Sequence, residues 1–266
     1  MKYIVIWLFL LLELFGAGIK APIVSVEDER VTVEIDKIDV GVSGFIIHEL
    51  ASERHSILKN AVVESFDPET KRAVLKVSDF DSLTNNALPK GKWKVQVGDT
   101  AILPYAYNRG FLVAPTEEIY YRVTRSVEAL EWVHPDIFAT ILSFNGHPTP
   151  IKSDFEDLSK TLSIGLVFLY LDKLLYTVDI KSLKILNISD APLEQVASDV
   201  VLPFYTRVEN IDAAWWGEGS DRLEEYAPHY YELLVKYNKE NKTLYEKIKN
   251  SDEKLHFLLE KFEIKG

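Results

Sequence analysis

Cysteine is absent from all 266 residues of the chain. Without cysteine there is no disulfide framework, so stability depends on a packed core. Thiolate zinc sites, iron–sulfur clusters and thiol nucleophiles are excluded for the same reason, as is a lipid-modified cysteine. Hydrophobic residues make up 47% of the chain, which is enough to build the core of one large or two small domains.

Basic residues are also scarce. The 30 lysines and arginines stand against 41 acidic residues, and the formal net charge is −11. Binding to nucleic acid needs a basic face that displaces counterions from the phosphates. No stripe of lysine or arginine of that kind dominates the sequence, so we expect no nucleic-acid partner.

The clearest targeting signal lies at the N-terminus. Lys2 precedes an apolar run from Tyr3 to Phe15 that only Glu13 interrupts, and small residues follow at Gly16-Ala17-Gly18. This order is typical of a signal peptide with its cleavage site. An uncleaved anchor is the alternative, but the run is shorter than the roughly 20 residues of a spanning helix. We therefore predict a signal peptide at 1–18 and no other membrane contact.

Exported proteins without disulfides are common in bacteria, whose envelope also suits such a signal. The expected location is therefore the periplasm or the outer cell surface of a bacterium.

Residues 23–114 have the period of β-strands. Val31-Thr32-Val33-Glu34-Ile35 alternates apolar and polar residues, and Asp67-Pro68-Glu69-Thr70 is a turn between two further apolar runs. Phe111-Leu112-Val113-Ala114 is assigned to the last strand of this region. Short strands joined by tight turns favour a small β-barrel or sandwich, and closure would remove exposed strand edges. The sequence thus predicts an N-terminal β-rich domain.

Helices are expected to begin directly after this domain. Thr116 is placed to cap a helix whose apolar stripe runs to Trp132. His134-Pro135 begins a second helix, which Asn145-Gly146 ends, and Ser153 is placed to cap a third.

The remainder of the chain combines a short β-sheet with C-terminal helices. The apolar run from Ser163 to Leu171 indicates a strand covered on both faces, with a hairpin partner after Asp172-Lys173. The last helix carries an apolar stripe from Leu244 to Phe262. Eight lysines and six acidic residues lie within 236–266, a mixture that solvation alone explains. Residues 115–266 are therefore predicted to form an α+β domain ending in an amphipathic lysine-rich helix, and the whole chain is assigned to the α+β class.

No catalytic or metal-binding motif is complete. His48-Glu49-Leu50-Ala51-Ser52 lacks the second histidine of a zinc-protease helix, and Gly98-Asp99-Thr100-Ala101 has alanine where an aspartic-protease turn needs glycine. Gly41-Val42-Ser43-Gly44 is one residue short of a nucleophile elbow, so Ser43 is expected in a turn. Trp215-Trp216 beside glycines suits packing at a chain bend better than stacking on sugars or contact with a membrane. We predict no catalytic residue, no metal site and no cofactor.

Several short sequences follow one another along the chain in a recognisable order: Gly41-Val42-Ser43-Gly44-Phe45-Ile46-Ile47-His48, His55-Ser56-Ile57-Leu58, Phe111-Leu112-Val113-Ala114-Pro115, His134-Pro135-Asp136-Ile137-Phe138-Ala139, Pro148-Thr149-Pro150-Ile151-Lys152-Ser153-Asp154-Phe155, Phe204-Tyr205-Thr206-Arg207-Val208-Glu209, and Tyr226 with Tyr230-Tyr231-Glu232-Leu233-Leu234. In this order they resemble the PgbA N-terminal domain family, whose namesake is a plasminogen-binding surface protein of Helicobacter-like bacteria.

This resemblance implies a non-enzymatic exported protein that captures host plasminogen. The kringle modules of plasminogen hold a lysine ammonium with an acidic pair and the lysine stem with aromatic walls. Binding in the family is attributed to a lysine-rich tail, and Lys261 and Lys265 are the nearest equivalents in this sequence. Both are therefore predicted to bind the partner.

Two other functions remain open. One is a structural or assembly module of the cell envelope, in which the last helix docks on a partner through its apolar stripe. The other is a hydrolase of envelope material, which needs titratable groups that converge in a pocket.

Overall fold

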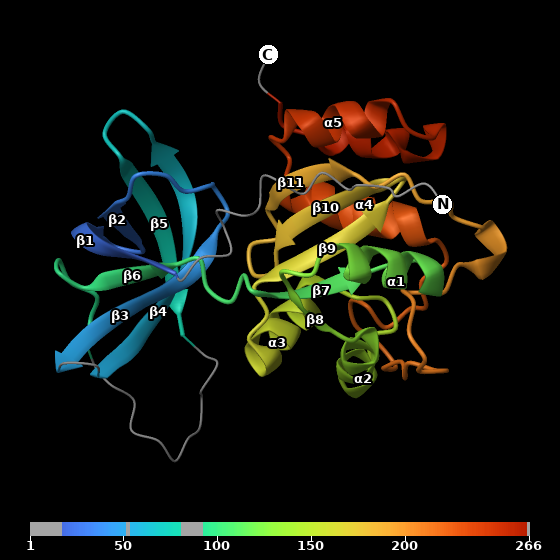
Figure 1. Cartoon of the computed structure of the whole chain (residues 1–266), viewed down its shortest axis with the longest axis horizontal. Helices are drawn as coiled ribbons and strands as arrows, with labels where there is room; N and C mark the ends of the chain where they lie inside the picture. Colours follow the sequence, from blue (N-terminus) through green and yellow to red (C-terminus); the bar gives the residue numbers. More distant parts are fainter. Residues whose placement is uncertain (1–17, 52–53, 81–92, 265–266) are drawn as a thin grey trace. The chain divides into compact units, whose positions relative to one another are not determined.

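The structure is a computed structural model that describes residues 18–51, 54–80 and 93–264. They form two compact units, 18–107 and 108–264, each of which is described by itself (Figure 1). The expected signal peptide lies, apart from Gly18, outside the described residues. Within the described ranges, every helix is too short or too polar to cross a bilayer.

The first unit is a closed barrel of six antiparallel strands, which confirms the predicted β-rich domain and shows the barrel, one of its two expected forms. The strand order is β1-β2-β5-β4-β3-β6, and pairing of β6 with β1 closes the ring. The alternation in the sequence sets the two faces: Val31 and Val33 are buried, whereas Arg30 and Glu34 are exposed. The strands are β1 (Ile19–Glu27), β2 (Arg30–Glu34), β3 (Ser43–Ala51), β4 (Arg54–Asp67), β5 (Arg72–Asp79) and β6 (Thr100–Leu103).

Gly44 allows strands β3 and β6 to approach closely. A Cβ atom at this position would lie 2.0 Å from the backbone oxygen of Ile102. Its neighbour Ser43 is buried as the first residue of β3 and not part of the expected turn, and its carbonyl accepts a hydrogen bond from Tyr105 N at 3.2 Å. The glycine therefore serves barrel closure, and Ser43 has a structural position.

Gly44→Ala is expected to lower the free energy of unfolding of the barrel by about 1–3 kcal/mol, because a backbone atom must move to admit the new methyl group. Urea unfolding measures this change. Leu50→Ala is the control, since Leu50 is exposed on the same strand. Equal destabilisation by the two substitutions would contradict the role assigned to Gly44.

The second unit is built on a five-stranded sheet in the order β11-β10-β9-β7-β8. Strand β7 lies parallel to both β8 and β9, and the strands from β9 to β11 are antiparallel. The assignment of Phe111–Val113 to the barrel was wrong: these residues form β7 and are buried on both faces of this second sheet. The strands are β7 (Arg109–Val113), β8 (Glu131–Val133), β9 (Leu166–Leu171), β10 (Leu174–Asp179) and β11 (Ile185–Asp190).

Helix α1 (Glu117–Ser126) is shorter than its apolar stripe indicated. Thr116 caps it as predicted, because its Oγ1 accepts a hydrogen bond from Ile119 N at 3.2 Å. The predicted continuation to Trp132 was wrong, since residues 131–133 form strand β8 beside β7.

Helix α2 (Pro135–Asn145) has the predicted ends. His134 Nδ1 accepts a hydrogen bond from Asp136 N at 3.3 Å, and Gly146 ends the helix with a φ of 74°. Helix α3 (Lys152–Leu162) differs, because the cap is not Ser153: Asp154 Oδ2 accepts a hydrogen bond from Ile151 N at 2.9 Å.

The C-terminal region contains helix α4 (Tyr226–Tyr237), helix α5 (Lys242–Lys249) and the 3-10 helix η2 (Glu253–Lys261), after a short 3-10 turn η1 (Ala197–Asp199). The prediction of a single last helix was wrong. The chain leaves the α-helix at Asn250, and Asp252 starts η2 by accepting a hydrogen bond from Lys254 N at 3.0 Å.

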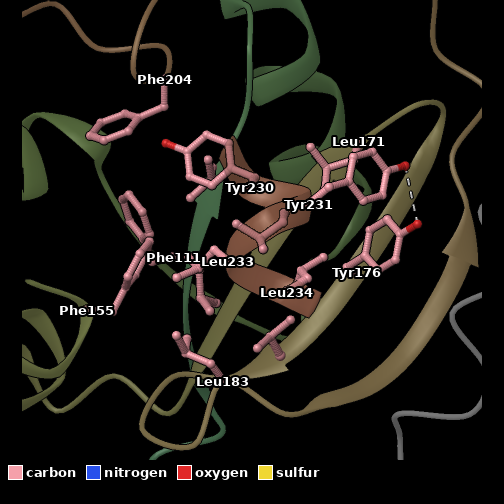
Figure 2. Packing of buried hydrophobic residues seen from close by; sticks show 14 of the residues in the cluster. Phe111, Phe155, Leu171, Tyr176, Leu183, Phe204, Tyr230, Tyr231, Leu233 and Leu234 are labelled. Carbon is pink, nitrogen blue, oxygen red and sulfur yellow. Dashed lines mark hydrogen bonds between the residues drawn. The ribbon is translucent and has the colours of Figure 1, made fainter. Parts of the chain in front are cut away.

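Three buried tyrosines, Tyr176, Tyr230 and Tyr231, lie among leucine and phenylalanine side chains in the core between α4 and the sheet (Figure 2). The Tyr176 hydroxyl donates to the Tyr231 hydroxyl at 3.4 Å, and Tyr231 donates to Asp172 Oδ2 at 2.9 Å. Burial raises the pKa of Tyr176 to about 12, so these hydroxyls remain neutral donors. The apolar stripe of α5 and η2 faces this core: Leu244, Ile248, Leu255 and Leu258 are buried, and Leu259 and Phe262 pack against the cluster.

His229 on α4 makes the stability of this unit sensitive to acid. Its Nε2 lies 2.9 Å from the Pro150 carbonyl oxygen, and burial lowers the pKa of its imidazole below the ordinary value. The unfolded chain therefore binds a proton more readily than the folded one. The contribution of neutral His229 to the free energy of unfolding is fully present above the pKa of the unfolded chain, near 6.5. This contribution is lost as the pH falls through the lower pKa of the folded protein.

His229→Gln keeps a donor for Pro150 but removes the proton-binding group. We expect the thermal midpoint of the variant to fall less than that of the wild type between neutral and mildly acidic pH. If the thermal midpoints of the two proteins fell equally with pH, the role of His229 in acid sensitivity would be contradicted.

Candidate functional site

Lysines cluster on α5 and η2. Lys242, Lys249 and Lys254 are exposed, and no ion pair is recorded for them among residues 18–51, 54–80 and 93–264. Their elements are anchored by buried leucine and isoleucine side chains, so the ammonium groups stand on an ordered surface. The fold thus presents several cations in the otherwise acidic chain.

Lys261, one of the two predicted partner-binding residues, lies at the end of η2. Its Nζ forms an ion pair with Glu232 and lies 5.6 Å from the centre of the Phe257 ring. The side chains of Lys261 and Glu232 are 44% and 51% exposed, and such surface pairs contribute only about 0–1 kcal/mol. A partner carboxylate can therefore replace Glu232 at little cost. Lys265, the other predicted residue, lies outside the described residues.

A second cluster of functional groups lies where β7 and β8 end. Because these strands are parallel, α1 and α2 begin at the same edge of the sheet, the usual place for a ligand in such folds. The Tyr205 hydroxyl donates to Glu117 Oε1 at 3.0 Å. Asp136 accepts hydrogen bonds from the backbone N of Arg207 at 2.8 Å and from its Nε at 2.7 Å.

The protonation states in this cluster favour the hydrogen bonds. Burial and the bond to Glu117 raise the pKa of Tyr205, so it stays a donor. Burial alone would raise the pKa of Asp136, but the hydrogen bonds from Arg207 and Thr206 outweigh it and lower that pKa. Each of these groups already has a partner within the cluster. The arrangement therefore acts as a brace that ties residues 205–207 to the starts of α1 and α2.

The incomplete motifs occupy structural positions. His48 lies on strand β3 and not on a helix, and its Nδ1 is 2.6 Å from Oδ1 of the buried Asp99. Asp99 also accepts a hydrogen bond from Gln96 N at 2.9 Å, so it stabilises the turn before β6. Across the described ranges, no three His, Asp or Glu side chains come together as a metal site would require.

A third group of residues is the exposed aromatic pair Trp215 and Trp216. Packing at a chain bend was the favoured interpretation of this pair, and it was wrong, because the two residues are 96% and 83% exposed. Phe144, at the end of α2, is 91% exposed. Among the large hydrophobic side chains of the described residues, these three are the most exposed.

The sequence pattern did not reveal the brace at the ends of β7 and β8. Asp136 and Arg207 are far apart in sequence, and only the parallel pairing of β7 with β8 brings the starts of α1 and α2 together. The sequence signal for this cluster was an acidic residue in the first turn of α1 and of α2. The favourable interaction of such a residue with the helix dipole explains its position without any partner side chain.

Comparison with known proteins gives a consistent result. The family described as plasminogen-binding protein pgbA N-terminal matches residues 18–234. The plasminogen-binding protein PgbA of Helicobacter pylori strain J99 / ATCC 700824 is 26% identical over 205 residues, which are 76% of this chain and 44% of that protein. The protein of the same name in strain ATCC 700392 / 26695 is 27% identical over 205 residues, 76% of this chain and 43% of the relative.

The chain therefore spans less than half the length of the curated relatives it matches. No solved structure matches it.

Proposed function

The chain belongs to the family described as plasminogen-binding protein pgbA N-terminal, and from this membership we propose that it is an exported, non-enzymatic protein that binds plasminogen. The proposed contacts are the exposed lysines of α5 and η2, Lys261 among them, together with Lys265 further along the chain. The observation that carries the proposal is the ordered group of exposed lysines in a chain of this family.

The chemistry of lysine recognition supports the choice of these side chains. A lysine-binding module needs an ammonium that can leave its own protein's carboxylates and an aliphatic stem that can enter an aromatic trough. Lys242, Lys249 and Lys254 are exposed and without a recorded ion pair in the described part of the chain, and Lys261 has only a half-exposed surface pair. These four lysines lie after residue 234, where the match to the family ends. Their proposed role therefore rests on the chemistry of lysine recognition and not on the family match.

The periplasm or outer surface is the proposed location. The apolar segment at 3–15 supports export, and a partner such as plasminogen, which the names of the relatives give, would be met outside the cell. Fractionation of cells combined with protease shaving tests it. A protein that shaving never removes from intact cells would contradict capture of a host protein.

Binding itself is tested with the full chain over immobilised plasminogen. Saturable binding that a soluble lysine analogue displaces is the expected result. Binding that the analogue leaves unchanged would contradict recognition through lysine, and absence of binding would contradict the proposed function.

Docking of the terminal stripe on an envelope component is less well supported. That function needs the stripe from Leu244 to Phe262 to face outward. Leu244, Ile248, Leu255 and Leu258 are buried in the unit's own core, and Phe262 packs against the same core. The stripe is thus used mainly for folding.

A further inference from the structure

Three aromatic side chains of the second unit are exposed to solvent. Trp215, Phe144 and Trp216 are 96%, 91% and 83% exposed, and together they are called the aromatic patch. Burial of aromatic side chains is among the most favourable contributions to folding and binding. Three such residues on neighbouring backbone segments therefore indicate a surface that a partner covers.

The patch is carried by backbone that is held in place. Ala214 N donates a hydrogen bond to the Gly146 carbonyl oxygen at 2.8 Å, and Thr149 N donates to the Gly219 carbonyl oxygen at 3.1 Å. These bonds fix the segment bearing both tryptophans beside the end of α2. Residues 212–218 are all exposed, so the segment presents its side chains outward.

The sequence on both sides of the tryptophans is strongly acidic. Residues 209–225 contain six acidic residues and one basic residue, Arg222. Glu218 is paired weakly with Lys236 at 3.5 Å. For the other five, no ion pair is recorded among the residues that the structure describes, and all five are exposed: Glu209, Asp212, Asp221, Glu224 and Glu225.

We propose that the aromatic patch and the carboxylates of residues 209–225 form a docking surface for a lysine- and arginine-rich segment of another protein. The faces of tryptophan rings attract ammonium and guanidinium groups, and carboxylates form charge-assisted hydrogen bonds with them. Exposed tryptophans also suit a membrane interface, but the exposed carboxylates of residues 209–225 oppose an anionic lipid surface. Charge complementarity therefore selects a cationic protein segment.

This surface is independent of the proposed binding of plasminogen. The lysines of α5 and η2 donate to acidic groups of a partner, whereas residues 209–225 accept from cationic groups. The failure of one proposal leaves the other intact, because each is tested with a different probe.

The test uses a fluorescent peptide of lysine and arginine residues spaced by glycine and serine, titrated with the full chain at physiological ionic strength. Trp215→Ala/Trp216→Ala leaves the net charge unchanged and is expected to weaken binding about tenfold. Asp212→Asn/Asp221→Asn is expected to weaken it as well. Glu246→Gln/Glu260→Gln makes the same change of charge on α5 and η2 and is expected to bind like the wild type.

Because the two tryptophans are almost fully exposed, the thermal midpoint of the tryptophan variant should equal that of the wild type. Undiminished peptide binding by this variant would overturn the proposal, since attraction by charge alone would explain it. Absence of peptide binding to the wild type would also overturn it. Vesicles of phosphatidylcholine with phosphatidylglycerol form the last arm, and tryptophan-dependent binding to vesicles without binding to the peptide would identify a membrane surface instead.

Discussion

Phe138→Ala is expected to lower the free energy of unfolding of the second unit by about 3–5 kcal/mol. Phe138 has no exposed surface. The centre of its ring lies 4.9 Å from the ring centres of Phe111 and Phe155 and 5.4 Å from the ring centre of Phe204. The four rings come from β7, α2, α3 and the irregular segment before residue 210. Loss of the central ring leaves a cavity that none of these elements can close without moving the others.

Phe144→Ala is a matched control for this substitution. It removes the same side chain from the same helix, but Phe144 is 91% exposed. Its expected effect on the free energy of unfolding is within about 0.5 kcal/mol. Urea unfolding followed by tryptophan fluorescence compares the two variants. Similar losses for both would contradict the assignment of Phe138 to the centre of the core.

The second large effect concerns binding of plasminogen. Replacement of Lys242, Lys249, Lys254 and Lys261 by glutamine is expected to weaken binding more than tenfold, because each substitution removes an ammonium that charge-assisted hydrogen bonds would hold. Glutamine has a helix propensity close to that of lysine, so α5 and η2 remain folded. Adding Lys265→Gln tests the remaining predicted residue.

The control for this variant replaces four exposed lysines of the barrel, Lys20, Lys71, Lys76 and Lys94, by glutamine. The change of net charge is the same in both variants, so a difference between them reports position and not charge. Equal loss of binding in the two would contradict a site on α5 and η2. Substitution is preferable to truncation, because the removal of α5 and η2 would also remove four buried residues of the core.

The barrel was predictable because its strands have one buried and one exposed face. Alternation such as that of Val31 and Val33 with their polar neighbours indicates strands directly. The strand order was not predictable, because it depends on which strands pair. Strand β4 (Arg54–Asp67) is long enough to pair with β3 along one edge and with β5 along the other, and nothing local in its sequence specifies that.

The wrong predictions for strands β7 and β8 have the same physical cause. Strand β7 was assigned to the barrel although Gly110–Val113 are all buried and lack alternation, which is the pattern of a strand covered on both faces. Strand β8 has three residues, too few to show a period, so the helical stripe before it concealed the strand. In both cases the partner strand decides the structure.

The break in the last helix had a local signal. Asn250, Ser251 and Asp252 are residues whose side chains compete with helical hydrogen bonds, and they separate α5 from η2. The apolar stripe continues across the break because both elements pack on the same core. A stripe alone therefore indicates a common buried face and not a continuous helix.

The exposed tryptophans could not be predicted from sequence. Aromatic residues beside glycines are usually buried, and the default expectation follows from the free energy of burying them. Trp215 and Trp216 depart from this expectation, because they are almost fully exposed, as the proposed docking surface requires. The expectation that aromatic side chains are buried considers folding alone, so it fails at a surface that is proposed to bind a partner.

The central claim is that lysines on α5 and η2 contact plasminogen, and acetylation footprinting tests it most directly. The full chain is treated briefly with an amine-reactive reagent, free and in complex with plasminogen, and each lysine is quantified by mass spectrometry. We predict that Lys242, Lys249, Lys254 and Lys261 become protected in the complex while Lys71 and Lys94 stay reactive. Unchanged reactivity on α5 and η2, or protection confined to the barrel, would contradict the claim.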